Sequence, residues 1–502
     1  MNILSNEKIN FNSLEENIYK DMMQLGRETL QDQLRFLDKL IKDFRDSDVF
    51  KCKDMQPTTI KSRLGEIPIS RRRYTMEING SEKSIYLLDE LLGINEFGLY
   101  SQSVLEMVVR EITKKSYRET AKTISEDTDS SISYTAVRNI VIKLGEKIKK
   151  LEEEKIKLYD EGKIEGSKEV EYVFCEHDGI YIKKQKSRKH KGKKKFKVKH
   201  FKKKNGKKSK KKKNGIELKI AVIHEGKEPR YTNDYKLKSK IIVGTAQKAR
   251  DLKKIEDTVI GTTYKEYKIK NIIINGDGAD WTGSIVEGAK ELFQLDMAHI
   301  QKKIYTAVSN EEYLAKMQKI VYTEQSSDIF SLIYNYKVEL EADKNTEELE
   351  RVKELEEYLK NNKKGLQRYQ YKLGYKEEQL EKLKEKLPSL GSEESHMYCV
   401  CRDRMKKNRT SWREESAEAL LKVIMYKMNG TILEIITRKA EEKIKEELAQ
   451  RISEPKKIKK IKYNEIPYAE KYKIVNNLTG RARDYAINVL RTKKFSELMI
   501  TN

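Results

Sequence analysis

Cysteines and long apolar runs are scarce in this sequence. Its 502 residues include four cysteines, and none of them forms a Cys-x-x-Cys pair, which argues against a disulfide framework and against a zinc site. No stretch approaches the roughly 18 apolar residues that a membrane span needs. The first residues, M-N-I-L-S-N-E-K, lack the apolar core of a signal peptide. We therefore expect a reducing, cytoplasmic protein with no membrane partner.

Apolar residues make up only 37% of the chain, and charged residues make up another 37%. A chain of this length accommodates two to four domains, so much of its surface must be charged helix or solvated tail. The net charge is +25, but the run from Lys183 to Lys213 alone holds 20 Lys or Arg and no acid, which leaves 25 − 20 = +5 for the remainder. The basicity is therefore local.

The lysine-rich tract, residues 183–214, consists of repeated lysine blocks with Gly and Asn and is too polar to bury a core. Strand-like segments at 170–182 and 216–224 flank it, which predicts a long excursion between two strands. Each lysine near a duplex can neutralise a phosphate and release counterions. We expect DNA contacts from its densest blocks; targeting and simple solvation are the alternatives. The blocks are Lys193, Lys194, Lys195 and Lys211, Lys212, Lys213.

The rest of the chain is organised around Ile272 to Trp281, I-I-I-N-G-D-G-A-D-W, an apolar strand that ends on a turn carrying Asp277. An apolar run of this kind predicts a buried central strand, and α/β folds build their sites at the carboxyl ends of such strands. Asp178, in V-F-C-E-H-D-G, follows a second strand-like run. A lone Asp-Gly is usually a loop carboxylate, but the pair predicts a metal site.

Around these strands we expect a third strand in D-Y-K-L-K-S-K-I-I-V-G, a helix over 246–258, a short helix from Trp281, and a strand-like Q-L-D-M-A-H-I. This order predicts a mixed sheet with helices, and it matches a ribonuclease-H-like core. The chain is then helical from 299 to 387. Leucines at strict sevens indicate a coiled coil, but Gly365 and Gly374 interrupt them, so we expect a helical hairpin folded against the core.

The N-terminal region contains an amphipathic helix over residues 1 to about 50, suited to packing or dimerisation. Asn79-Gly80 lies between two alternating runs and predicts a β-hairpin. Arg71, Arg72 and Arg73 on its first arm are either DNA contacts or a solvated strand edge.

A helix-turn-helix is indicated by S-Y-R-E-T-A-K-T-I followed by S-I-S-Y-T-A-V-R-N-I-V-I-K-L, with Ser133 or Thr135 as the N-cap. In such a motif Tyr134, Thr135 and Arg138 lie near the exposed start of the second helix, which enters the major groove. An ordinary helical hairpin is the alternative.

These patterns predict an α-rich α+β multidomain protein. The expected parts are a helical segment (1–55), a hairpin module (56–100), a helix-turn-helix region (101–160), the first part of the core (168–300), a helical insertion (301–388), the completion of the core (389–425) and a basic helical region (426–502). Two Mg²⁺ or Mn²⁺ ions held by three carboxylates can activate a water or a 3′-hydroxyl for phosphoryl transfer. The third carboxylate must come from a later element that folds back to the first two.

Four blocks resemble bacterial insertion-sequence transposases of the ISLre type, which are DDE enzymes related to the Mutator-like group. The blocks are E-H-D-G, N-G-D-G-A-D-W, Q-L-D-M-A-H-I-Q-K-K and E-S-H-M-Y-C-V-C-R-D-R-M-K-K-N-R-T-S-W; L-G-E-I-P-I-S-R-R-R-Y and L-L-D-E-L-L-G-I near the N-terminus are also similar. The resemblance covers nearly the whole chain. It implies a ribonuclease-H-like core, interrupted by a helical insertion, that acts on transposon ends with Mg²⁺ or Mn²⁺.

Carried over by position, the resemblance assigns the catalytic, metal-binding triad to Asp178, Asp277 and Glu394, with Glu393 adjacent to the last. The family has E-G-H where this chain has Glu394-Ser395-His396. It further implies supporting roles for three residues near the second aspartate, namely Trp281, Asp296 and His299. The alternatives are a helix cap for Asp296 and a buried structural histidine for His299.

The expected function is DNA strand cleavage by water, followed by strand transfer by the freed 3′-hydroxyl. The expected partners are transposon ends and target DNA, with a homodimer or larger assembly in the bacterial nucleoid. The alternatives are a non-catalytic DNA-binding protein derived from a transposase, and a related nuclease.

Overall fold

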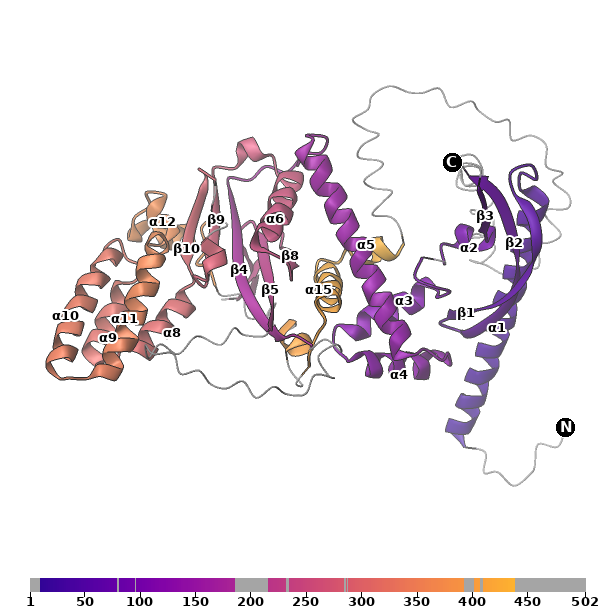
Figure 1. The fold of residues 1–502 in the computed structure, drawn as a ribbon, viewed down its shortest axis with the longest axis horizontal. Helices are drawn as coiled ribbons and strands as arrows, with labels where there is room; N and C mark the ends of the chain where they lie inside the picture. The colour runs from indigo at the N-terminus through magenta and orange to yellow at the C-terminus, as the bar shows by residue number, and fades with distance from the viewer. Residues whose placement is uncertain are drawn as a thin grey trace, which may run out of the picture. The chain divides into compact units, whose positions relative to one another are not determined.

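The computed structural model describes residues 10–78, 81–94, 96–185, 215–231, 234–283, 286, 288–391, 401–406 and 410–437. These residues form two compact units (Figure 1). Of the described residues, the first unit contains those up to 111 together with 117–140, and the second contains 112–116 and those from 141 to 437. Helix α5 passes from one to the other.

The first unit combines a long helix with a three-stranded antiparallel sheet of order β1-β2-β3, followed by short helices. Its elements are α1 (Phe11–Phe44), β1 (Lys51–Ser62), β2 (Gly65–Ile78), β3 (Ser81–Ile85), α2 (Leu87–Leu92), α3 (Gln102–Ile112), α4 (Tyr117–Thr128) and the start of α5 (Tyr134–Asp160). The predicted hairpin is confirmed, because β2 and β3 pair antiparallel on either side of Asn79 and Gly80.

Helix α1 packs through one face because Leu34 and Ile41 lie two turns apart on it and are buried against Ile67 and Tyr74 of β2. The predicted N-terminal helix is thus confirmed. Strand β1 was not predicted. It is an edge strand whose first nine residues are exposed or half-buried, so its sequence lacks the apolar alternation that marks a strand.

The second unit is built on a five-stranded mixed sheet of order β10-β9-β4-β5-β8. The strands are β4 (Tyr172–Lys183), β5 (Gly215–His224), β8 (Ile241–Thr245), β9 (Asn271–Gly276) and β10 (Glu291–Leu295). Strand β9 runs parallel to both β4 and β10, whereas β5 runs antiparallel to β4 and β8. With a partner on each side, β9 is the central strand that its three consecutive isoleucines predict.

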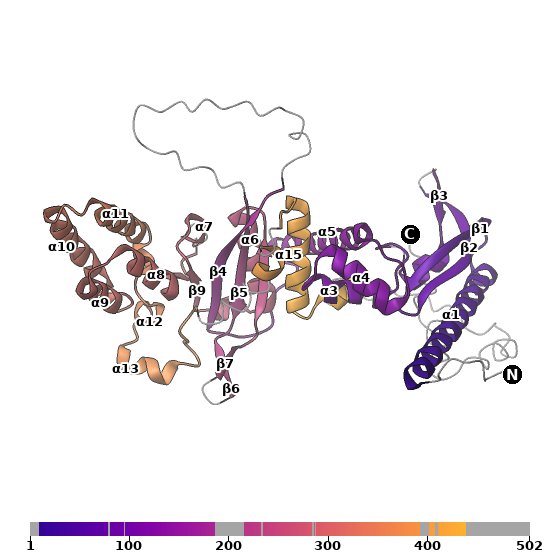
Figure 2. The same ribbon diagram turned by 90° about the horizontal axis from the view of Figure 1, so that it is seen from below.

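Both faces of this sheet are covered. On one face, Val173, Ile274 and Leu295 pack with Leu252 of α6 (Ala249–Thr263) and Ile300 of α8 (Met297–Ala307). On the other face, Phe174 and Ile273 pack with Tyr369, Leu387 and Leu390. Figures 1 and 2 show the helices from α8 to α11 on the β10 side of the sheet, and α15 (Glu414–Met428) on the β8 side.

Residues 297–383 are largely helical, as predicted, but they form a series of helices and not the expected single hairpin. The segment contains α8, α9 (Glu311–Ile320), α10 (Ile329–Ala342), α11 (Thr346–Asn361), α12 (Tyr369–Lys372) and α13 (Glu377–Leu380), and α15 and α16 (Ile432–Ile436) come later. A 3₁₀ turn at Lys363–Gly365 and a positive φ of 84° at Gly374 break the leucine repeat. No continuous coiled coil forms in these residues.

Two of the predicted strands differ in position or extent from those in the structure. The segment expected to be the third strand is divided by a turn, in which Ser239 has φ 53°. Its first part is β7 (Asp234–Leu237), which pairs with β6 (Lys227–Tyr231) in a separate hairpin. Its second part is β8. The expected strand at Q-L-D-M-A-H-I lies earlier, in β10, because Asp296 already caps α8.

Candidate active site

Three aspartates follow matched positions on three neighbouring parallel strands. His177 of β4 pairs with Gly276 of β9, and Gly276 pairs with Leu295 of β10. The next residues along the three strands are Asp178, Asp277 and Asp296. The fold therefore brings three carboxylates, separated by up to 118 residues in the sequence, to one edge of the sheet.

The three aspartates also belong to one face of the sheet. Two residues before them, Glu176, Asn275 and Gln294 lie opposite one another, and side chains two residues apart in a strand point to the same face. The Oε1 atom of Gln294 accepts a hydrogen bond from the backbone of Tyr369, which belongs to the cluster covering that face. The aspartates thus lie on the side of the sheet where the chain later returns.

Asp178 is half-buried, and its Oδ1 accepts a hydrogen bond from the backbone N–H of Gly179 at 2.6 Å. Burial raises the pKa of the Asp178 carboxyl to about 6; the Gly179 hydrogen bond opposes this rise, and the charges of Asp277 and Asp296 add to it. A carboxyl group near two other carboxylates is the electrostatic pattern of a cation site.

Asp277 lies in a tight turn directly after β9. Its Oδ1 accepts a hydrogen bond from the N–H of Ala279 at 2.9 Å, and Gly278 has φ 74°. The hydroxyl of Tyr358, at the end of α11, donates to the Asp277 carbonyl oxygen at 2.8 Å. Sequence reasoning did not identify Tyr358, because nothing in a charged helix signals a contact with a residue 81 positions away.

Asp296 is the N-cap of α8, since its Oδ1 accepts from the backbone N–H of His299 at 2.9 Å. The same oxygen lies 2.8 Å from His299 Nδ1. Burial raises the pKa of Asp296, but the hydrogen bonds from His299 outweigh burial and hold that pKa below its usual value. The bond to Asp296, together with the charges of Asp178 and Asp277, raises the pKa of His299. The pair therefore favours a charged carboxylate beside a protonated imidazole.

Trp281 and His177 lie behind Asp178. The His177 and Trp281 rings meet edge to face, with centroids 6.0 Å apart, and Nε2 of His177 lies 2.5 Å from Oε2 of the buried Glu256 on α6. A Cβ added to Gly179 would lie 3.6 Å from Trp281 Nε1. Trp281 thus packs against the strand at Asp178, which agrees with a supporting rather than a reacting position.

Glu394 and Glu393 lie outside the described residues. Gly391, the residue at which the described chain stops before them, lies at the carboxylate edge. Its N–H donates to Oε2 of Glu176 at 2.9 Å, and a Cβ added to it would overlap Oδ2 of Asp296.

The aspartates supply hard oxygen ligands, the type that Mg²⁺ and Mn²⁺ prefer. Within the described ranges, no three His, Cys, Asp or Glu side chains are grouped closely enough to hold a metal ion. Asp178 and Asp277 each direct one oxygen to a backbone N–H of their own turn. Their chemistry fits a divalent cation, and their described side-chain positions do not by themselves form its complete ligand set.

Arg71, Arg72 and Arg73 are engaged within the first unit. Arg71 Nε lies 2.8 Å from Oδ1 of Asp89, with both side chains buried. Arg72 pairs with the buried Asp38 at 2.5 Å, and Arg73 pairs with Asp54. The guanidinium groups therefore connect β2 to α2, to α1 and to β1, respectively, and each already pairs with a carboxylate.

Helices α4 and α5 form the two-helix segment in which a helix-turn-helix was expected. Ser133 is the N-cap of α5, because its Oγ accepts from the N–H of Ala136 at 3.1 Å. Tyr134 and Thr135 are exposed, and Arg138 is half-buried. Ala121 and Ile124 of α4 are buried, Tyr117 is half-buried, and the apolar residues of α5 are buried. The latter are Val137, Ile140, Val141 and Leu144.

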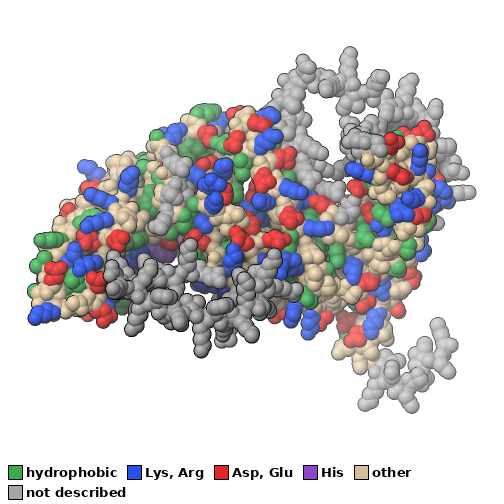
Figure 3. Space-filling view, in the orientation of Figure 1, with side chains coloured by type: hydrophobic (Ala, Val, Ile, Leu, Met, Phe, Trp, Pro, Cys, Tyr) green, Lys and Arg blue, Asp and Glu red, His purple; other side chains and the backbone are tan. Residues whose placement is uncertain are grey.

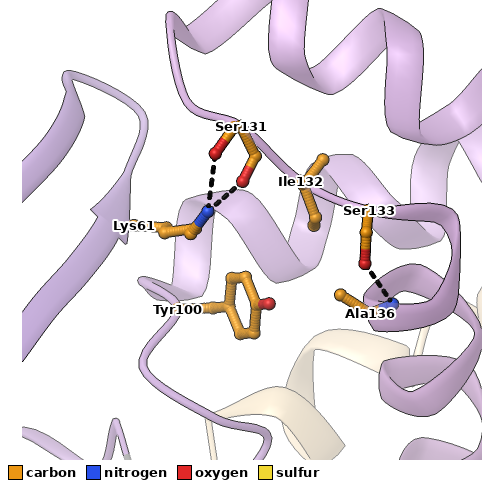
Figure 4. A pocket seen from close by; sticks show the side chains of 6 residues that line it. All are labelled: Lys61, Tyr100, Ser131, Ile132, Ser133 and Ala136. Carbon is orange, nitrogen blue, oxygen red and sulfur yellow. Dashed lines mark hydrogen bonds between the residues drawn. The ribbon is translucent and has the colours of Figure 1, made fainter.

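A hollow of about 450 Å³ lies beside the start of α5, between Lys61, Tyr100 and the Ser131–Ala136 segment (Figure 4). Lys61 Nζ bonds to Ser131 Oγ at 3.2 Å and pairs with Glu66 at 3.2 Å. Because the ammonium group is already neutralised by a carboxylate, the hollow is not a ready anion site.

The lysine blocks Lys193–Lys195 and Lys211–Lys213 lie outside the described residues. Their flanking strands β4 and β5 pair antiparallel down to Lys183 and Gly215, so the tract does connect two neighbouring strands. Over the described surface seen in Figure 3, acidic and basic side chains are interspersed. No helix in the described part of the chain is both long enough and apolar enough to span a bilayer.

Comparison with known proteins shows relatives along most of the chain. A model of the uncharacterised protein family UPF0236 matches residues 4–216 and 192–443. A UPF0236 protein of Caldanaerobacter subterraneus subsp. tengcongensis is 25% identical over 434 residues, which cover 85% of this chain and 80% of that protein. Another from the same organism, whose name combines eleven locus designations, is 25% identical over 81% of this chain and 75% of its own length. A Streptococcus gallolyticus protein, named as lying in the vanSb 3′ region, is 25% identical over 68% of this chain and 69% of its own. The chain therefore belongs to the family UPF0236.

Proposed function

We propose that this protein is the DNA transposase of an insertion sequence, and that Asp178, Asp277 and Glu394 are its catalytic carboxylates. The observation that carries the proposal is the alignment of Asp178 with Asp277 directly after the last paired residues of β4 and β9, His177 and Gly276. Asp277 follows the carboxyl end of β9, where α/β sheets form their sites, and Asp178 lies beside it within β4. Gly391, three residues before Glu394, lies against the same edge.

The strand arrangement supports a ribonuclease-H-like core. The first three strands of the sheet, β4, β5 and β8, follow one another as antiparallel neighbours. The chain then passes through α6 and returns on the other side of β4, adding β9 and β10 parallel to it. This order, with only the second strand reversed, is the order of that fold.

In the proposed reaction, the carboxylates bind the metal ions, and Asp296 and His299 support the site. Two Mg²⁺ or Mn²⁺ ions, when bound by the carboxylates, would activate a nucleophile and stabilise the leaving oxygen of an in-line displacement. Asp178 and Asp277 would hold these ions, and the ions would in turn bind the oxygens of the reacting phosphate. Water attacks the phosphorus and the P–O3′ bond breaks, which releases a 3′-hydroxyl. That hydroxyl then attacks a phosphodiester of the target, where a new P–O3′ bond forms and the target's own P–O3′ bond breaks to leave a free target 3′-hydroxyl. Asp296 with His299 holds the start of α8 beside the two aspartates.

DNA binding is assigned to the helix-turn-helix formed by α4 and α5, through Tyr134, Thr135 and Arg138, and to the lysine tract. Multiple copies in one genome are typical of insertion sequences, and a name that combines eleven locus designations is what a protein encoded by repeated copies would carry. We include in the proposal a nucleoid location and a dimer or larger assembly, because two element ends must be joined.

The decisive experiment compares metal-dependent cleavage of a duplex that carries the element's own flanking ends. The variants are Asp178→Asn, Asp277→Asn and Glu394→Gln, with Glu393→Gln as the matched control, since it removes the neighbouring charge. We expect the first three to lose cleavage while retaining duplex binding, and the control to cleave as the parent does.

Three results would redirect the assignment. Loss of cleavage in Glu393→Gln but not in Glu394→Gln would move the third carboxylate by one residue. Sequence-specific binding of the ends without cleavage by the parent, at any Mg²⁺ or Mn²⁺ concentration, would replace the transposase with a non-catalytic DNA-binding protein. Cleavage without preference for the element's ends would indicate a general nuclease.

A further inference from the structure

The helical segment between β10 and residue 391 reaches the Asp277 turn at one point. The hydroxyl group of Tyr358, in the last turn of α11, donates a hydrogen bond to the Asp277 carbonyl oxygen at 2.8 Å. Four residues later, the Asn362 side-chain amide faces the Gly278 carbonyl at 3.5 Å. Two consecutive carbonyl groups of the turn that presents a proposed catalytic carboxylate are therefore held by the end of one helix.

The turn has little space to move. A Cβ added to Gly278, at φ 74°, would stand 2.7 Å from Leu295 Cδ2 and 2.8 Å from the Tyr358 hydroxyl oxygen. A positive φ of this size is readily adopted by glycine. The turn is thus enclosed between the end of β10 and Tyr358, and its carbonyl orientation depends on that hydroxyl.

Tyr358 itself is held firmly. Its neighbours Leu355 and Leu359 are buried in the main core of the second unit. The ammonium group of Lys303, one helical turn after His299 on α8, lies 4.1 Å from the centre of the Tyr358 ring. The tyrosine therefore connects three elements, α8, α11 and the turn after β9.

We propose that Tyr358 is a positioning residue through which the helical segment sets the divalent-cation affinity of the site. By holding the Asp277 carbonyl, it orients the turn so that the Asp277 carboxylate remains beside Asp178. This inference rests on the metal site of the proposed function. It adds that residues 297–383, which interrupt the proposed core in sequence, form part of the site's support.

The test is Mn²⁺ binding to the full-length protein, monitored by electron paramagnetic resonance of the free ion, for the parent, Tyr358→Phe and Tyr334→Phe. Tyr334 is the matched control, because it belongs to α10 of the same segment and is 64% exposed. Loss of one hydrogen bond should raise the Mn²⁺ concentration at half-saturation about two- to tenfold in Tyr358→Phe. Tyr334→Phe should bind as the parent does. Cleavage by Tyr358→Phe should be impaired at low Mn²⁺ and recover at saturating Mn²⁺.

A second variant acts on the same turn from the other side. Gly278→Ala introduces strain and a clash with Tyr358, and it should weaken Mn²⁺ binding in the same direction. Equal Mn²⁺ binding by the parent and Tyr358→Phe would overturn the inference, as would a loss of cleavage in Tyr358→Phe that saturating Mn²⁺ does not restore. If Asp277→Asn binds Mn²⁺ as the parent does, the proposed metal site itself fails, and that result is separate from the behaviour of Tyr358.

Discussion

Gly391 and Asp296 are in such close contact that no side chain fits between them: a Cβ on Gly391 would overlap Asp296 Oδ2. Gly391 also has φ 87°, and its N–H is bonded to Glu176. The chain thus returns to the carboxylate edge through a residue that must be glycine. This contact defines where the last part of the proposed core begins.

We expect Gly391→Ala to lower the free energy of unfolding by more than the roughly 1–3 kcal/mol that a strained φ costs alone, because it adds a clash with Asp296. Gly374→Ala is the control, since Gly374 has φ 84° but no atom within 4 Å of an added Cβ. Urea unfolding of the two variants measures the difference. Equal reductions in stability would mean that Gly391 does not press against Asp296 in solution.

Asp178→Asn should stabilise the protein at pH 8 in the absence of divalent cations. The pKa of Asp178 is raised from 3.8 to about 6, so the folded state holds its proton more tightly than the unfolded chain does. Its favourable contribution is present below pH ~4 and is lost as the pH rises through about 6. Asparagine keeps the acceptor for the Gly179 N–H without the charge. The gain at pH 8 should approach about 2–3 kcal/mol and vanish near pH 4.

Thermal melts at the two pH values, in EDTA, check this prediction. Adding Mn²⁺ should stabilise the parent and not Asp178→Asn, because only the parent retains the carboxylate to bind it. A variant that is less stable than the parent at both pH values would contradict the electrostatic account of the site.

How far the sequence predicts this arrangement depends on how local the signal is. Strand β9 was predicted because Ile272, Ile273 and Ile274 are consecutive and apolar, and the helix after Asp296 was anticipated as a capping alternative. Strand β1 was missed because an exposed edge strand needs no apolar alternation. Local patterns therefore indicated buried strands such as β9, but not the exposed edge strand of the other sheet.

The surroundings of the carboxylates depend on interactions that no local pattern reports. Tyr358 reaches Asp277 across 81 residues, and Gly391 reaches Glu176 across 215. Arg71 and Arg72 were considered as DNA contacts, but each faces a buried aspartate that the folded chain brings from elsewhere. Such pairings follow from tertiary packing and not from spacing.

Asp296→Asn should lower the pKa of His299 toward its ordinary value of 6.5, because the bond to the Asp296 carboxylate is the main cause of its rise. The raised pKa means that the pair stabilises the folded state fully below pH ~6.5 and that this stabilisation disappears as the pH passes the folded value. Proton NMR of the histidine rings, with His299→Gln used for assignment, measures the change. An unchanged titration of His299 in Asp296→Asn would show that the two side chains are not bonded in solution.

Stability and duplex-binding measurements should distinguish the arginines that stabilise the first unit from the lysines that we propose bind DNA. Arg72→Gln leaves the carboxylate of Asp38, which is only 2% exposed, without its partner, so we expect it to lower the stability of the first unit by about 3 kcal/mol. The double variant Arg72→Gln, Asp38→Asn removes both charges and should recover much of that stability. At a temperature where all variants are folded, neither should alter the salt dependence of duplex binding.

Deleting residues 186–213 should have the opposite effects to Arg72→Gln: it should change the salt dependence of duplex binding and not the stability of the first unit. It should leave the melting of the first unit unchanged and reduce the slope of log Kobs against log salt by about 0.9 for each phosphate that the protein no longer neutralises. Fluorescence anisotropy with one duplex over a salt series measures both sets of variants. A reduced slope in Arg72→Gln, or a parental slope in the deletion, would reassign the DNA-binding surface, because the slope reports the number of neutralised phosphates whatever the stability of the protein.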